Sequence, residues 1–230
     1  QGNASHLLGM LDADGYPENG LHRLLVEQAA FRDVLRPVPL DRWSVPDKSP
    51  TGALMLLPSY LRTAAIPIES PDPFGLRKRL RELQDKYQVI VIDTSPTVSM
   101  LDGAIYIAAD SFIYVTQLEA LSFEGLKQGL AQIENSNRDR RDMGMTELKV
   151  LGIQPNLMRA GTVNHRTSIA YLGEAFEGLV WTPITNRTKW NDATNYGKLV
   201  YAYAPSSGEA DDAWRMVAHA EKALWQPITK

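Results

Sequence analysis

The chain contains no cysteine, which excludes a disulfide framework, a thiolate metal site and a catalytic thiol. It also lacks any apolar run of the roughly 18 residues that a membrane-spanning helix needs. Nor is basic charge in excess, because 24 lysines and arginines stand against 27 acidic residues and the net charge is -3. Any binding to nucleic acid must therefore come from a local patch.

Two motif classes are missing as well. No Gly-x-x-x-x-Gly-Lys-Ser/Thr phosphate-binding loop occurs in these residues. The four histidines show no metal-ligand spacing, and no Ser-His-Asp order follows the strand pattern. Metal hydrolase and serine hydrolase functions thus have no support. The chain begins with Gln1 and not with methionine, so we expect that a segment precedes it.

What is present is the composition of a globular domain. Of the 230 residues, 44% are hydrophobic and 22% are charged, which excludes a disordered tail, a collagen-like fibre and a coiled-coil rod. The length predicts a single domain over residues 1–230.

Runs of branched apolar residues predict buried strands. The strongest run is Val89–Ile92, where four β-branched residues in a row are typical of a parallel strand covered on both faces. The other expected strands lie at 52–58, 110–116, 148–153 and, more weakly, 179–184. Helical patterns cover 76–87, 97–109, 121–136, 164–176 and 208–225, and the charged stretch 138–145 predicts a solvated loop. This alternation predicts an α/β fold, a doubly wound and mostly parallel sheet with helices on both faces.

Polar residues follow the predicted strands, at the sheet edge where α/β proteins bind ligands. Asp93 comes directly after Val89–Ile92, as in a Walker B motif whose carboxylate holds magnesium, although an ordinary turn or helix-capping aspartate fits the pattern equally well. Asn156 follows the strand at 148–153 and could face a purine edge, but alone it is also a common turn residue.

These strand ends resemble a known family, the ParA/Soj/MinD partition ATPases with a deviant Walker A loop. The segment Tyr87-Gln-Val-Ile-Val-Ile-Asp-Thr-Ser-Pro96 is similar to the family's Walker B motif. The opening Gln1-Gly-Asn-Ala-Ser5 resembles the tail of the motif that ends the family's second strand. Further similar segments, in the family's order, are Leu56–Leu61, Val115–Glu119, Gly152–Asn156 and Pro205–Ser207.

The resemblance implies a P-loop NTPase-like fold whose first strands, phosphate-binding loop and catalytic residues lie upstream of this chain. Asp93 would be the carboxylate associated with Mg²⁺. ATP would be contacted by Asn156 and by the loop of Thr185, Asn186 and Arg187. Nonspecific DNA would meet Lys189, with Arg159 and Arg166 extending the basic patch.

The implied activity is ATP-dependent homodimerisation and DNA binding in chromosome or plasmid partition. A ParB-like DNA-binding protein would stimulate hydrolysis, and the protein would be cytoplasmic and nucleoid-associated. Without a phosphate-binding loop, we expect these 230 residues alone to bind little ATP and to hydrolyse none.

Two alternatives belong to other functional classes. Ser95, Leu118, Thr185 and Gly208 depart from the family pattern. Three of these departures, Ser95, Thr185 and Gly208, favour a non-hydrolysing adaptor or DNA-associated dimerisation module. A membrane-cycling relative would need an amphipathic C-terminal helix with a basic face. The last helical pattern is short and is followed by Pro227, so no membrane partner is expected.

Overall fold

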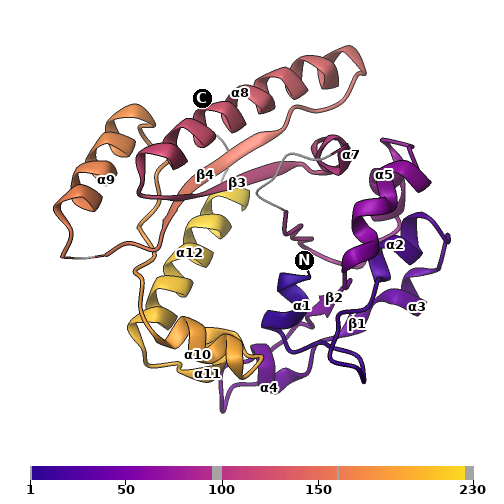
Figure 1. The fold of residues 1–230 in the computed structure, drawn as a ribbon, viewed down its shortest axis with the longest axis horizontal. Helices are drawn as coiled ribbons and strands as arrows, with labels where there is room; N and C mark the ends of the chain where they lie inside the picture. The colour runs from indigo at the N-terminus through magenta and orange to yellow at the C-terminus, as the bar shows by residue number, and fades with distance from the viewer. Residues whose placement is uncertain (1, 95–99, 160, 226–230) are drawn as a thin grey trace. The chain divides into compact units, whose positions relative to one another are not determined.

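The computed structural model describes residues 2–94, 100–159 and 161–225 (Figure 1). It divides into two compact units, which we name unit 1 (residues 1–109 and 190–205) and unit 2 (residues 110–189 and 206–230). Each unit has its own hydrophobic core. The expectation of a single domain over residues 1–230 stays a prediction.

Unit 1 consists mainly of short helices. A two-stranded antiparallel ladder pairs β1 (Arg36–Pro37) with β2 (Met55–Leu56), so only two residues of the strand expected at 52–58 form one. The helices of this unit are α1 (Asn3–Leu7), α2 (Gly20–Leu25), α3 (Phe31–Val34), α4 (Leu40–Trp43), the 3₁₀ helix Leu61–Ala65, α5 (Ile66–Glu69), α6 (Gly75–Arg81), α7 (Met100–Ala108) and α11 (Val200–Tyr203). Helix α10 (Lys189–Asn195) also lies in unit 1, apart from its first residue, Lys189, which belongs to unit 2.

The core of unit 1 is built around α2, α3 and the residues after α6. Leu24, Phe31, Val34 and Leu83 are buried together. Helix α6 ends within the pattern expected at 76–87, and Leu83 and Tyr87 beyond it still pack on the core as the spacing predicts.

The strongest strand prediction, at Val89–Ile92, was wrong. These residues have no strand assignment, and Val89, Ile90 and Val91 are 45%, 42% and 86% exposed. A run of branched residues forms a strand only when a neighbouring backbone supplies the ladder hydrogen bonds. No strand among the described residues pairs with this segment.

Tyr201 on α11 gives the stability of unit 1 an alkaline limit. Burial raises the pKa of the Tyr201 phenol, whereas an unfolded tyrosine titrates near pH ~10. The unfolded chain therefore loses its proton first, and the free energy of unfolding is intact below pH ~10 and falls as the pH rises above it. We expect Tyr201→Phe to flatten this fall, measured as urea midpoints between about pH 9 and pH 11. Equal alkaline slopes in both proteins would contradict the assignment.

Unit 2 contains a parallel pair of strands, β3 (Ser111–Gln117) and β4 (Lys149–Asn156). Both strands were predicted, and β4 runs three residues further than expected. The weaker strand expected at 179–184 is reduced to a single parallel bridge between Ile153 and Val180. It is held by two backbone hydrogen bonds, Ile153 N to Leu179 O at 2.8 Å and Trp181 N to Ile153 O at 2.9 Å.

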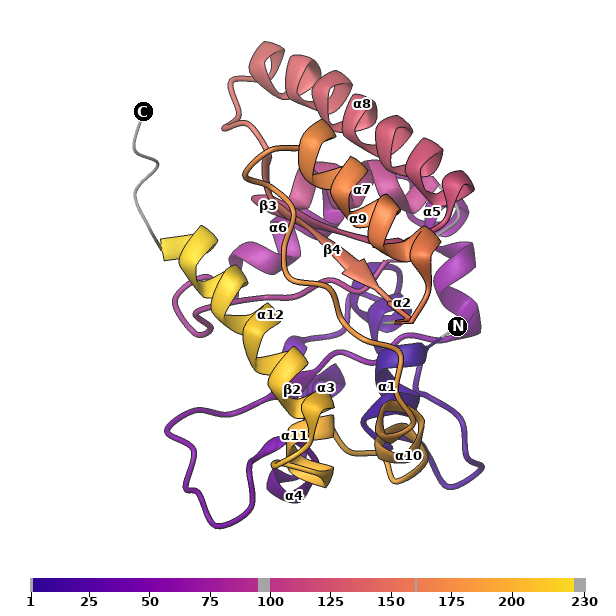
Figure 2. The same ribbon diagram turned by 90° about the vertical axis from the view of Figure 1, so that its left-hand side faces the viewer.

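Helices cover both faces of β4 in unit 2. Figures 1 and 2 show α8 (Ala120–Asp142) and α9 (Val163–Ala175) on one face and α12 (Gly208–Trp225) on the other. Leu118, Leu126, Ile153 and Leu172 form the core on the α8 and α9 face. This arrangement of a parallel pair between helices confirms the predicted α/β class.

The C-terminal part of α8 corrects the loop expected at 138–145. The helix continues to Asp142, and Arg140 is only 2% exposed. Its Nε donates to the carbonyl of Thr146 at 2.6 Å. A charged sequence favours solvent, but here one guanidinium closes the turn between α8 and β4.

Candidate functional site

The predicted site residues of unit 2 gather where β3 and β4 end. Gln117 and Asn156, the last residues of the two strands, are register partners. A small pocket of about 60 Å³ opens beside them. Its lining consists of Gln117, Leu118, Glu119, Leu157, Arg159, His165 and Asn186. Carboxyl ends of parallel strands are where α/β folds bind ligands, so the pocket lies where the sequence predicts it.

A sharp turn follows β4. Leu157 has a φ of 55°, a left-handed conformation that is rare for a branched, bulky residue. The Asn156 carboxamide supports the turn, because its Oδ1 accepts a hydrogen bond from Leu157 N at 2.8 Å. Asn156 thus has the structural role of a turn residue, and its amide nitrogen is the group left for a ligand.

The predicted base-contacting loop lies alongside this turn. Met158 and Thr185 form a parallel bridge, and Asn186 N donates to Met158 O at 2.8 Å. Thr185 N donates instead to the Asp212 carboxylate at 3.0 Å. Since both backbone donors are occupied within the protein, this loop presents a ligand mainly with the Asn186 side chain, which can donate and accept.

The predicted basic residues differ in their surroundings. Arg187 is held by Asp212, with Nη1 2.8 Å from Oδ2. Arg159, Arg166 and Lys189 are exposed, and none of them forms an ion pair within the part of the chain that is described. Three cations thus remain available to an anion.

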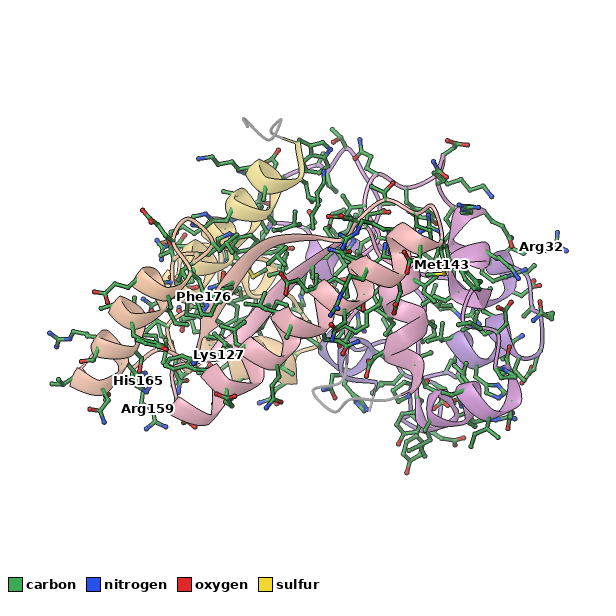
Figure 3. The ribbon with its side chains drawn as sticks, turned by 90° about the horizontal axis from the view of Figure 1, so that it is seen from above. Arg32, Lys127, Met143, Arg159, His165 and Phe176 are labelled. Carbon is green, nitrogen blue, oxygen red and sulfur yellow. The ribbon has the colours of Figure 1, made fainter. Side chains whose placement is uncertain are left out.

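His165 on α9 orders the first of these cations. Its Nδ1 accepts a hydrogen bond from the backbone nitrogen of Arg159 at 3.1 Å. Figure 3 shows Arg159 and His165 close together at one end of unit 2, with Lys127 of α8 at the same end. Sequence reasoning overlooked His165 because histidine was sought as a metal ligand, and a histidine that caps a loop has no such spacing.

Asp93 lies in unit 1, at the end of the extended segment that begins at Val89. It is exposed. An exposed carboxylate can bind a hydrated Mg²⁺, and it can equally accept a hydrogen bond from a backbone N–H group in a turn. Ser95, one of the departures from the family pattern, lies outside the described residues. The role of Asp93 stays a prediction.

Another departure from the family pattern has a packing reason. Leu118 is 3% exposed and is part of the core on the α8 and α9 face. Its carbonyl accepts a hydrogen bond from Ser168 Oγ at 3.3 Å, which joins α9 to the end of β3. A leucine at this position therefore adds apolar burial where the family usually has proline.

No helix in residues 2–94, 100–159 or 161–225 is long and apolar enough to cross a membrane. Over the same ranges, no group of at least three histidine, aspartate and glutamate side chains is placed to hold a metal ion.

Comparison with known proteins identifies relatives along most of the chain. A family model described as an AAA domain matches residues 1–145. The sporulation initiation inhibitor protein Soj of Bacillus subtilis is 24% identical over 216 residues, covering 92% of this chain and 79% of that protein. The chromosome-partitioning ATPase Soj of Thermus thermophilus is 27% identical over 179 residues, covering 77% and 69%.

A solved structure confirms the fold. The septum site-determining protein MinD of Pyrococcus horikoshii, in complex with Mg-ADP, aligns with a TM-score of 0.71 and 17% sequence identity. The alignment covers 98% of this chain and 81% of that chain. The α/β class predicted from the strand pattern and the P-loop NTPase-like fold implied by the family resemblance are therefore confirmed.

Proposed function

Because the chain belongs to the AAA-domain family of ParA/Soj/MinD-type ATPases, we propose that it is the nucleotide-binding part of a partition ATPase that binds ATP with Mg²⁺. In this proposal ATP joins two copies into a homodimer, the dimer binds DNA without sequence preference, and a ParB-like protein stimulates hydrolysis. The protein would accordingly act in the cytoplasm, on the nucleoid. The observation that carries the proposal is the pocket at the ends of β3 and β4, which is lined by Arg159 and Asn186 among others.

The residues at this edge fit a purine nucleotide. The Asn186 amide can both donate and accept, and the Asn156 amide nitrogen can donate, which suits the edge of a base. Asp93 would hold Mg²⁺, which prefers carboxylate and water oxygens. The metal would neutralise charge on the phosphates. This chain would supply Asp93 to the metal, and Asn156 and Asn186 would orient the base.

The exposed cations suit a DNA backbone. Lys189, Arg159 and Arg166 are unpaired within the described residues, so each can approach a phosphate without first breaking an ion pair. Dimerisation would double this patch and convert weak attraction into useful affinity. Such a local patch would allow a chain whose net charge is -3 to bind DNA.

We expect Lys189→Gln to weaken DNA binding by the ATP-bound full-length protein. Each lost phosphate contact makes the slope of log affinity against log salt less steep by roughly 0.9. A dimer loses two contacts, so its slope should become less steep by about 2. Lys222→Gln is the matched control, because Lys222 is also an exposed lysine but lies near the end of α12. Fluorescence anisotropy with a random duplex between about 50 and 200 mM salt measures both slopes. Equal slopes for Lys189→Gln and wild type would refute the role of Lys189.

The adaptor function remains the second candidate, and one observation favours it: Ser95, Thr185 and Gly208 depart from the family pattern. An adaptor would bind DNA to the same extent with and without ATP. The two candidates therefore differ in whether nucleotide changes DNA affinity.

A further inference from the structure

The N-terminal part of α12 contains two buried acidic residues, Glu209 in the first turn and Asp212 directly after it. Glu209 is 5% exposed and Asp212 is 2% exposed. Acidic residues near a helix N-terminus are favourable, and Ser207 Oγ caps the helix by accepting from Ala210 N at 3.2 Å. Burial, however, makes a carboxylate costly unless donors surround it, so the partners of these two residues define what this part of the helix does.

Those partners are alternate residues of the loop at 185–189. Asp212 Oδ2 accepts from Thr185 N at 3.0 Å and from Arg187 Nη1 at 2.8 Å. Glu209 Oε1 accepts from Lys189 N at 3.2 Å. Because the loop is bound at every second residue, α12 fixes the path of the loop. Arg187 is the side chain of the loop whose charge α12 neutralises.

Gly208 completes this arrangement. A Cβ at position 208 would lie 2.9 Å from Arg187 Nη1 and 3.0 Å from its Cζ. The glycine therefore leaves the space that the guanidinium occupies. Gly208, which departs from the family pattern, and the bound Arg187 therefore belong to one local structure.

We infer that Asp212 is a positioning residue that withholds Arg187 from DNA and leaves Lys189 as the phosphate-contacting cation of this loop. The choice of DNA as the ligand rests on the proposed function. The contact between Asp212 and Arg187, which we call the clamp, rests on the distances above. Asp212 also pairs with Arg215, one helical turn further along α12. Removing the Asp212 charge should consequently release cations instead of only damaging the fold.

The test is a gain of DNA binding. In the ATP-bound full-length protein, Asp212→Asn should steepen the salt dependence of DNA binding by about 1 for each arginine released in the complex. Adding Arg187→Gln to Asp212→Asn should remove the part of the gain that Arg187 supplies. Asp211→Asn is the matched control, since Asp211 is the neighbouring exposed aspartate on the same helix and its substitution changes the net charge equally.

The contrary results are distinct. The inference is overturned if the wild type binds DNA and Asp212→Asn shows the same salt slope as the wild type. It is also overturned if Asp211→Asn steepens the salt slope as much as Asp212→Asn does. Should Asp212→Asn fail to fold, Gly208→Ala replaces it, because the added methyl displaces the Arg187 guanidinium without changing charge. Gly208→Ala must then steepen the slope.

Failure of the proposed function is distinguishable from failure of the clamp. If the wild type binds no DNA, melting temperatures still test the clamp. Arg187→Gln and Asp212→Asn should each lower Tm by about 4 °C, and the double variant by clearly less than the sum. Additive losses would refute the Arg187–Asp212 coupling whatever the protein binds.

Discussion

Replacing Gly152 with alanine should lower the melting temperature by about 6–12 °C, the equivalent of about 3 kcal/mol in the free energy of unfolding. Gly152 lies in the buried part of β4, and a Cβ there would be 2.0 Å from Nε1 of Trp181. Trp181 is 6% exposed and stacks on His219 of α12, with ring centroids 5.5 Å apart. The indole cannot yield without moving that helix.

The matched control for this substitution is Gly173→Ala on α9. Gly173 is exposed, and a methyl group added at that position would meet nothing within 4 Å. Alanine is about 1 kcal/mol better than glycine inside a helix, so the control should be stabilised. Thermal unfolding followed by circular dichroism measures both variants. A Gly152→Ala protein as stable as the wild type would show that Trp181 does not pack against β4.

Replacing Arg140 with alanine should cost about 3 kcal/mol, because the substitution opens a cavity and leaves the Thr146 carbonyl without its donor. The guanidinium is almost fully buried, and its Nε lies 2.6 Å from that carbonyl. The turn that leads from α8 into β4 depends on this contact. Urea unfolding with a constant m-value is the measurement.

Arg138→Ala is the control for Arg140→Ala. Arg138 lies on the same helix, half a turn earlier, but is exposed. Its loss should change the free energy of unfolding by less than about 0.5 kcal/mol. Similar losses for the two arginines would contradict a structural role of Arg140.

The parts of the fold that were predictable are those whose pattern is local. β3, β4, α9 and α12 were predicted within a few residues, because apolar runs and helical spacing determine them without reference to distant partners. Val89–Ile92 failed for the opposite reason: its residues favour a strand, but strand formation depends on a second backbone.

The site shows the same division. Asn156, Thr185 and Asn186 could be placed together from sequence, because polar residues at the ends of parallel strands meet at one edge. The role of Asp212 could not be predicted, since an acidic residue near the N-terminus of a helix is ordinary. That it is buried against Arg187 depends on where the loop at 185–189 passes, which spacing along the chain does not specify.

The most direct test of the proposed function is DNA binding by the full-length protein with Mg-ATP, with Mg-ADP and without nucleotide. A partition ATPase should bind a random duplex at least about tenfold more tightly with Mg-ATP, because dimerisation doubles the number of phosphates contacted. The salt slope should rise together with the affinity. Equal affinity and equal salt slope in all three conditions would contradict the proposal and favour the adaptor.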